Sequence, residues 1–238
     1  MINFKISSPN CSKKPRKTNK IKFIIIHYTG MQSKRVSISR LINPNFEVSC
    51  HYLIDRQGNI IKMVDDNKVA WHAGKSKWGN NINLNKMSIG IELVNKGHKF
   101  GYEKFTKIQI SKLIKLCLFL KKKYKIKNSS ILGHSDISPL RKIDPGEKFP
   151  WPELNKKGLG VQPKSEKISD FEKFDKSKIK KIFFANLYKI GYRYFEKNKN
   201  SQNLLIVKAF KRRFLPKEIN GNITQKTLEI SYYLAKKS

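Results

Sequence analysis

The octapeptide IKFIIIHY (21–28) contains an unbroken apolar run and decides the fold class of the chain. Its β-branched and aromatic residues follow one another almost without a polar position, which is typical of a strand buried on both faces of a sheet. Thr29 and Gly30 come directly afterwards and form a turn signal. His27 therefore stands at the carboxyl end of a buried strand, where sheet proteins commonly present catalytic side chains.

Three further segments predict strands. The segments 50–55 and 60–64 flank a Gly-containing turn, which indicates a β-hairpin. MSIGIELV (87–94) alternates large apolar residues with small or polar ones, as a strand does. The segment 131–151 starts with a short apolar run and continues with Gly, Pro and polar residues, so we expect a strand end that leads into a functional loop.

One long helix is predicted between these strands. Thr106 and Gln109 stand in capping-box spacing, and apolar residues then recur at helical intervals as far as Tyr124. The segment 71–85 is rich in Gly and Asn and is expected to be a long loop. Strands mixed with helices in this order predict an α/β (mixed α+β) fold, with a central mixed β-sheet flanked by helices.

The last third of the chain predicts a small three-helix bundle. Apolar residues recur at helical spacing in 179–190, 207–214 and 228–235. Gly191 is placed to end the first of these helices, and Thr224 is placed to cap the third. The predicted division is a first domain at 1–160, a polar linker at 161–176 and a helical domain at 177–238.

Composition excludes several classes of protein. The chain has 238 residues, of which 39% are hydrophobic, enough to fill a core and too many for a disordered chain. Its three cysteines are scattered and cannot form a disulfide framework. The net charge of +34 favours a polyanionic partner, and nucleic acid is the first to consider. Only eight of the 51 basic residues are Arg, and the excess is spread along the chain, so we expect no specific nucleic-acid partner.

Two histidines and one aspartate form a candidate metal site. His134 follows Gly133 at a predicted strand end, and Asp144 comes ten residues after it. Together with His27 they supply two imidazoles and one carboxylate, a ligand set of catalytic zinc that leaves one position for water. The spacing of the residues does not by itself establish that they meet, since an isolated histidine is more commonly a packing residue.

The surrounding residues resemble a known family, the zinc-dependent N-acetylmuramoyl-L-alanine amidases of the AmpD and AmiD type. Five blocks carry the resemblance in order: IIIHYTG (24–30), SCHYLIDRQGNI (49–60), AWHAGKSKW (70–78), NKMSIGIELVNKG (85–97) and GHSDISPLRKIDPGEKFPW (133–151). The C-terminal part is similar to the three-helix peptidoglycan-binding module of the AmiD subgroup, through LYKIGY (187–192), AFKRRFLP (209–216) and NGNITQKT (220–227).

The resemblance implies a role for particular residues. His27, His134 and Asp144 occupy the family's zinc-ligand positions. Glu92 occupies the position of the catalytic glutamate, and Lys142 that of a basic residue that assists catalysis.

Three more residues lie in the matching blocks and are weaker candidates for substrate binding. His51, Trp71 and His72 combine an indole with imidazoles, which could line a groove for a sugar or a peptide. For His51, a packing role behind the site is an equally open alternative.

The implied reaction is zinc-dependent hydrolysis of the amide between N-acetylmuramic acid, or its 1,6-anhydro form, and L-alanine of the stem peptide. The implied partners are peptidoglycan or its fragments, in cell-wall turnover or recycling. One alternative is a non-catalytic peptidoglycan-binding protein that keeps the fold, and a more remote one is a basic nucleic-acid-binding protein. The intact set of candidate ligands with Glu92 favours the enzyme.

The expected location of the protein rests on the absence of apolar segments. The sequence shows no run that fits a signal peptide or a transmembrane helix, which needs about 20 apolar residues. We therefore expect a cytoplasmic protein without a transmembrane segment. We also expect it to be a monomer. The wall-binding-like C-terminal part points to the alternative of a periplasmic or outer-membrane-associated enzyme.

Overall fold

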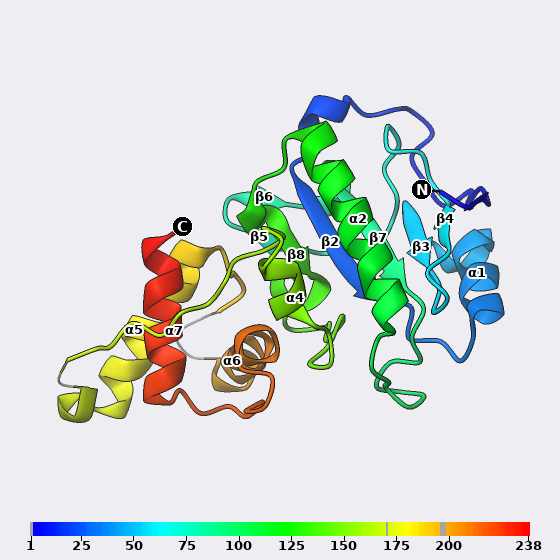
Figure 1. The fold of residues 1–238 in the computed structure, drawn as a ribbon. Coiled ribbons are helices and arrows are strands. Elements are labelled where there is room, and N and C mark those ends of the chain that lie inside the picture. Colours follow the sequence, from blue (N-terminus) through cyan, green and yellow to red (C-terminus); the bar gives the residue numbers. More distant parts are fainter. Residues whose placement is uncertain (1, 170, 196–198) are drawn as a thin grey trace.

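The computed structural model describes residues 2–169, 171–195 and 199–238. Its centre is a six-stranded mixed sheet with the order β1-β4-β3-β7-β2-β8, in which only β3 and β4 pair antiparallel (Figure 1). The strands of this sheet are β1 (Phe4–Lys5), β2 (Phe23–Tyr28), β3 (Tyr52–Ile54), β4 (Ile60–Lys62), β7 (Ser88–Leu93) and β8 (Ile131–Gly133). A separate two-stranded ribbon consists of β5 (Lys77–Trp78) and β6 (Asn81–Ile82).

Helices cover the sheet and continue beyond it. They are α1 (Lys34–Ile42), α2 (Lys107–Tyr124), α3 (His134–Ile137), α4 (Trp151–Asn155), α5 (Lys176–Ile190), α6 (Asn200–Phe214) and α7 (Gln225–Lys236). Short 3-10 turns lie at Thr18–Lys20, Pro44–Phe46, Leu84–Met87, Asn128–Ser130 and Phe171–Lys173. The long helix α2 lies across one face of the sheet, and α5, α6 and α7 form a group beside the β8 edge (Figure 1). The predicted fold class is confirmed.

The neighbouring interior strands β2 and β7 show how the sheet separates two faces of the molecule. They pair in parallel register over their whole length, so that Ile24 lies opposite Ile89 and His27 opposite Glu92. Alternate residues such as Ile24 and Ile89 belong to the apolar core that includes α2. The positions between them, Phe23 and Ile25 on β2, point to the opposite face and pack in a smaller apolar cluster. The same alternation places His27 and Glu92 on that second face.

The elements predicted from the apolar pattern are confirmed, with one local difference at the start of α2. The Thr106 hydroxyl accepts a hydrogen bond from the Gln109 amide at 3.2 Å, as a cap does. The Gln109 side chain does not return to Thr106 as a capping box requires. It donates instead to the carbonyls of Ile54 and Val94, at 3.0 and 3.2 Å. These carbonyls lie at the ends of neighbouring strands and need a buried donor.

Several elements differ from the sequence-based expectation. The predicted loop 71–85 contains the β5–β6 ribbon. The helix α1 and the edge strand β1 were not predicted, because the apolar pattern of their sequences is too weak. In α1 only Ser37 and Leu41 are buried, so the helix lacks the apolar stripe that marks an amphipathic helix.

The three C-terminal helices share one apolar core that extends to the first part of the chain. Phe183, Phe210 and Leu228 are buried in it, and Trp78 of the β5–β6 ribbon packs against it. Gly191 ends α5 at φ +130°, and a Cβ at this glycine would come within 2.5 Å of the Trp78 ring. The predicted division into residues 1–160, 161–176 and 177–238 stays a prediction, and residues 1, 170 and 196–198 of these ranges lie outside the described part.

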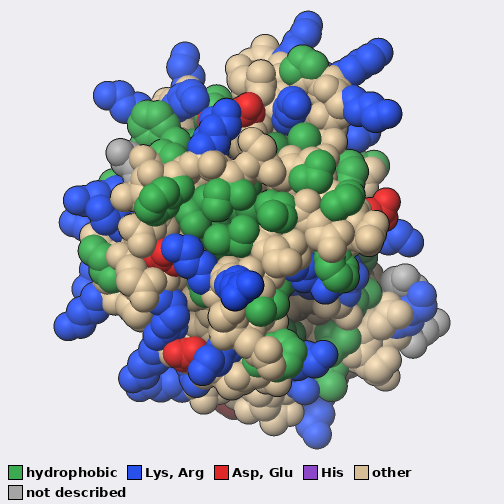
Figure 2. Space-filling model, turned by 90° about the vertical axis from the view of Figure 1, so that its right-hand side faces the viewer, with side chains coloured by type: hydrophobic (Ala, Val, Ile, Leu, Met, Phe, Trp, Pro, Cys, Tyr) green, Lys and Arg blue, Asp and Glu red, His purple; other side chains and the backbone are tan. Residues whose placement is uncertain are grey.

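The surface is basic, and none of the described helices combines the length and the apolarity that a membrane crossing requires. On the face drawn in Figure 2, Lys and Arg side chains surround an apolar patch, and acidic side chains are few. The positive charge on this face is dispersed rather than gathered into one stripe.

Candidate metal and active site

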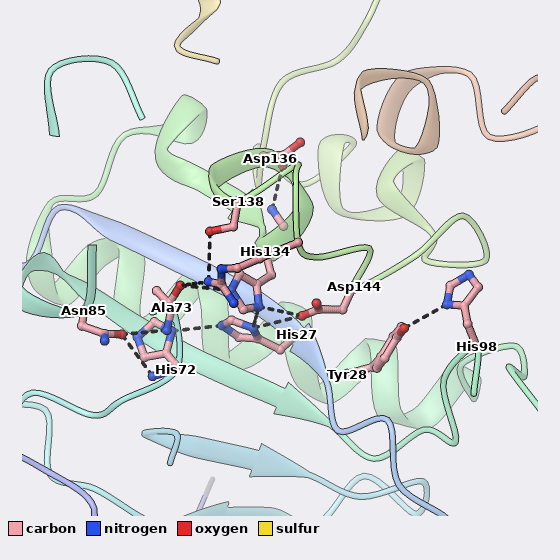
Figure 3. Close-up of polar contacts among 12 residues, drawn as sticks. His27, Tyr28, His72, Ala73, Asn85, His98, His134, Asp136, Ser138 and Asp144 are labelled. Atoms are coloured by element: carbon pink, nitrogen blue, oxygen red, sulfur yellow. Dashed lines mark hydrogen bonds and ion pairs between the residues drawn. The ribbon is translucent and has the colours of Figure 1, made fainter. Parts of the chain in front are cut away.

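Three side chains from distant parts of the chain meet at the carboxyl end of β2. Nδ1 of His27 lies 2.9 Å from Nδ1 of His134, and each of these atoms lies 3.1 Å from Oδ2 of Asp144 (Figure 3). All three side chains are buried. Three donor atoms at these mutual distances form a compact group that could hold one metal ion.

The sheet brings the two histidines together. β2 and β8 pair in parallel with Ile26 opposite Gly133. The next residue of each segment, His27 in β2 and His134 directly after β8, therefore lies at the same carboxyl edge of the sheet. The backbone then returns Asp144 to the same place, because the Ser135 amide donates to the Asp144 carbonyl at 2.9 Å. The local sequence therefore builds a strand end, a helical turn and a returning loop around one point.

The charges in this group suit a metal site. Burial, reinforced by the charge of His134, lowers the pKa of His27 to about 4, so that this imidazole is neutral at neutral pH. Burial alone would raise the pKa of Asp144, but the charge and hydrogen bonds of His134 and His27 outweigh it, and the pKa is lowered. Neutral imidazoles and an ionised carboxylate are the forms that bind metal ions.

The outer nitrogens of both histidines are also held. His134 Nε2–H donates to the carbonyl of Ala73 at 3.2 Å, which leaves Nδ1 to face Asp144. His27 Nε2 lies 3.0 Å from Nδ1 of His72. Metal-binding histidines typically donate their second N–H to such partners, which orients the ring. The three donor atoms, and the hydrogen bonds that orient the two histidine rings, therefore fit a zinc ion.

Glu92 lies next to this group with one unpartnered oxygen. It is the register partner of His27 on the neighbouring parallel strand and points to the same face. Its side chain is buried, and Oε2 has no hydrogen-bond partner in the described part of the protein. Burial, reinforced by the charge of Asp144 and opposed by Lys142, raises the pKa of Glu92 to about 8. A buried carboxylate of this kind is typical of a group that exchanges protons with a substrate or water.

Lys142 supplies a positive charge at the site. It lies half-buried in the loop between α3 and Asp144, and its amide donates to the Ser138 carbonyl at 3.0 Å. Its positive charge lowers the pKa of both Glu92 and His27, so it influences the candidate base as well as a candidate metal ligand.

The three weaker candidates occupy different depths. His51 and His72 are buried, with their rings 5.7 Å apart and edge to face, and His72 lies between His51 and His27. Nδ1 of His51 accepts a hydrogen bond from the Gly90 amide at 3.0 Å. Trp71 is half-buried and pairs through its backbone with Ser49. The role of these three residues in substrate binding stays a prediction.

The structure adds residues that the sequence pattern did not indicate. The Asn85 side chain accepts hydrogen bonds from the amides of His72 and Ala73, at 3.0 and 2.7 Å. Arg141 donates to the Ala73 carbonyl at 2.7 Å. A signal was present, because Asn85 opens one of the five blocks and Arg141 precedes Lys142, but no pattern showed that both support one backbone segment.

His98 lies in an exposed loop near the site, and its ring makes several contacts. Its Nδ1 lies 2.9 Å from the Tyr28 hydroxyl, as Figure 3 shows, and its Nε2 lies 3.0 Å from Glu147. Its ring stacks on Tyr102 with the centroids 4.4 Å apart. These contacts gather aromatic and charged side chains from distant segments at the carboxyl end of β2.

Comparison with known proteins gives a consistent result. The model of the Amidase_2 family, described as N-acetylmuramoyl-L-alanine amidase, matches residues 17–147. AmiD of Escherichia coli K12 is 31% identical over 234 residues, which cover 92% of this chain and 83% of that protein. AmpD of Haemophilus influenzae is 35% identical over 164 residues, which cover 61% of this chain and 86% of that protein.

Two solved structures match the whole architecture. The structure of E. coli AmiD with anhydro-N-acetylmuramic acid-L-Ala-D-gamma-Glu-L-Lys has a TM-score of 0.79 at 28% identity, and covers 95% of this chain and 92% of that chain. AmpDh3 of Pseudomonas aeruginosa has a TM-score of 0.80 at 27% identity, with 95% and 94% covered. At this coverage the similarity includes the C-terminal helices as well as the sheet.

Proposed function

The chain belongs to the N-acetylmuramoyl-L-alanine amidase family, and on this basis we propose that it is a zinc-dependent enzyme that cleaves muramyl peptides. The bond is the amide between N-acetylmuramic acid, or its 1,6-anhydro form, and L-alanine. One observation carries the proposal. The donor atoms of His27, His134 and Asp144 converge within about 3 Å of one another, beside the unpartnered oxygen of Glu92.

His27, His134 and Asp144 would hold the zinc ion through Nδ1, Nδ1 and Oδ2. A bound zinc ion supplies Lewis acidity, which polarises a carbonyl oxygen and makes water more acidic. Three protein ligands are typical of a catalytic zinc site, in contrast to the four of a structural one. The proposed zinc dependence follows from this ligand number and from the chemistry of the donors.

Glu92 would act as the general base and general acid of the reaction. Its Oε2 would take a proton from the attacking water and return it to the leaving amine of L-alanine. General acids and bases work best when their pKa lies near the operating pH. In the metal-free protein burial raises the pKa of Glu92 to about 8, so the protonated and ionised forms of this carboxyl lie close in free energy near neutral pH. Lys142 would stabilise the negative charge that develops on the carbonyl oxygen, and a well-placed donor of this kind contributes about 3 to 4 kcal/mol.

The proposed substrates are peptidoglycan and its anhydro fragments, in wall turnover or recycling. The complex of E. coli AmiD with an anhydromuramyl tripeptide supports the fragment as substrate, because that protein matches nearly the full length of this chain. The cytoplasmic location and the monomeric state expected from the sequence stay predictions, as does the alternative periplasmic or outer-membrane-associated location.

The test compares products from two substrates. Purified protein is incubated with anhydromuramyl peptides and with intact sacculi, with and without a chelator, and the products are identified by mass spectrometry. We expect release of free stem peptide that stops with the chelator and returns when zinc is added. Binding to sacculi without any cleavage would instead support a non-catalytic wall-binding protein. Full activity in the chelator would overturn the proposed zinc dependence.

A further inference from the structure

A chain of hydrogen bonds runs from His27 into the interior, away from the proposed metal position. His27 Nε2 lies 3.0 Å from His72 Nδ1, and His72 Nε2 lies 3.1 Å from the Ser88 hydroxyl (Figure 3 shows the first of these contacts). The Ser88 hydroxyl lies 2.6 Å from the carbonyl of Leu84. All four residues are buried.

The last member of the chain sets the direction of every hydrogen bond. The Leu84 carbonyl can only accept, so the hydroxyl proton of Ser88 points toward it. The Ser88 oxygen must then accept from Nε2–H of His72, and the neutral His72 ring has its unprotonated nitrogen at Nδ1. That nitrogen accepts from Nε2–H of His27. The proton of His27 is thereby held at Nε2, and the lone pair of Nδ1 faces His134 and Asp144.

The position of the His72 ring is built into the neighbouring strand. A Cβ added at Gly90 would come within 2.4 Å of His72 Cγ, so only glycine at this position leaves room for the ring. The backbone amide of His72 is held by the Asn85 side chain at 3.0 Å, and the His51 ring closes the other side. The ring therefore has a fixed place and a fixed orientation.

We propose that His72 and Ser88 are positioning residues that hold His27 in the Nε2–H tautomer and present its Nδ1 for metal binding. The proposal rests on the zinc site of the proposed function. It assigns His72 a role behind the ligand His27, in place of the substrate contact suggested by its sequence block. It also gives a reason for Gly90 in the strand that carries Glu92.

Zinc affinity gives the first test. The dissociation constant of zinc is measured by competition with a chromophoric chelator, on protein first stripped of metal. His72→Leu removes the acceptor and is expected to weaken zinc binding about 10- to 100-fold, the usual effect of losing a group that orients a metal ligand. His72→Asn can place its carbonyl oxygen where Nδ1 was, so we expect it to recover much of the affinity. Ser88→Ala is expected to have a smaller effect in the same direction.

A matched control separates orientation from general loss of packing. Ser37 lies on helix α1, away from the site, and its buried hydroxyl donates to the Ser33 carbonyl at 2.8 Å. Ser37→Ala therefore removes a buried hydrogen bond of the same kind as Ser88→Ala. It is expected to leave the zinc dissociation constant unchanged. Thermal unfolding of each metal-free variant shows whether it is folded. If His72→Leu does not fold, Ser88→Ala and the measurement of the tautomer decide the question.

The tautomer itself is measured on the metal-free wild-type protein by ¹⁵N NMR of the histidine rings. We expect His27 to carry its proton on Nε2, and we expect Nδ1–H to become populated in His72→Leu. A His27 ring protonated at Nδ1 in the wild type, or an unchanged zinc dissociation constant in folded His72→Leu, would overturn the inference. If the wild type binds no zinc, the proposed function fails, while the NMR measurement still tests the hydrogen-bond chain.

Discussion

Two buried carboxylates, Asp136 and Asp144, lie close to His134 in the sequence but belong to different kinds of cluster. Oδ1 of Asp136 accepts from the Tyr192 hydroxyl at 2.6 Å, and its Oδ2 accepts from the Gly133 amide at 2.8 Å and from Arg213. Arg213 belongs to α6, so this cluster joins the C-terminal helices to the turn that begins with His134.

In the Asp136 cluster, groups of the chain itself satisfy both the hydrogen bonds and the charge of the carboxylate. The Arg213 guanidinium also donates to the Ile131 carbonyl at 3.1 Å and lies 4.2 Å from the centre of the Trp151 ring. Both oxygens of Asp136 thus have donors, and its charge is balanced by one buried cation. Such a cluster is typical of a structural contact.

The cluster around Asp144 is incomplete without an additional positive charge. Its carboxylate faces two imidazole nitrogens at 3.1 Å, and the nearby Glu92 keeps an oxygen without a donor. A proton or a metal ion among these acceptors stabilises the group, and only a metal ion could also activate a substrate. Burial alone therefore does not identify a functional carboxylate. The unfilled hydrogen-bonding capacity does.

Replacing His134 gives the largest expected effect, because it breaks the incomplete cluster directly. His134→Ala removes one of three zinc ligands, and we expect zinc content to fall from about one equivalent to nearly none, with a loss of kcat/KM of about 1,000-fold or more. Zinc content is measured by atomic spectroscopy and activity by release of stem peptide. The comparison variant Asp136→Asn is expected to retain zinc. Equal zinc loss in both variants would contradict the distinction between the clusters.

Replacing Glu92 tests whether proton transfer and metal binding are separate. Glu92→Gln keeps the shape of the side chain but removes the base, so we expect zinc to stay bound while kcat falls about 100- to 10,000-fold. Metal content and steady-state kinetics on the same sample give the answer. Retained kcat would assign the base to another residue.

Breaking the complete cluster should cost stability rather than chemistry. Arg213→Leu leaves Asp136 buried without its cation, and we expect the free energy of unfolding to fall by about 3 to 5 kcal/mol. Denaturant unfolding followed by circular dichroism measures the change. The double variant Arg213→Leu/Asp136→Asn removes the stranded charge and should recover part of the loss. A change below about 1 kcal/mol for the single variant would show that the ion pair does not hold the two parts together.

The pH dependence of stability gives the smallest expected effect. In the metal-free protein Glu92 has a pKa of about 8 when folded, above its ordinary value of 4.5, so the folded state holds this proton more tightly. The contribution of Glu92 to stability is therefore present at low pH and is lost as the pH rises from about 4.5 to 8. Glu92→Gln lacks this loss, and above pH 8 it should be more stable than the wild type by about 2 to 4 kcal/mol.

Unfolding curves of the metal-free wild type and Glu92→Gln at pH 5 and pH 8.5 measure this difference. The two proteins should be similar at the lower pH and should diverge at the higher one. A constant difference would mean that burial does not raise the pKa of Glu92.

Much of the sheet and the candidate site could be predicted from the sequence. The apolar run before His27 and the alternation around Glu92 produce β2 and β7, because strand formation follows from local patterns that repeat every residue or every second residue. The family resemblance is confirmed, and the residues that it indicated as ligands do meet. The helix α1 was missed because only two of its residues are buried, too few for a periodic signal.

The sequence by itself determined most of the segments that become strands and helices, and which side chains are candidates for chemistry, since both depend on local patterning and residue type. Only the tertiary structure decided which candidate does what. Asp136 is neutralised by Arg213, 77 positions later, and His72 meets His27 across 45 positions. The parallel register of β2 with β7 and β8 likewise brings His27 beside Glu92 and His134, because hydrogen bonds between strands bring together residues that no local pattern connects.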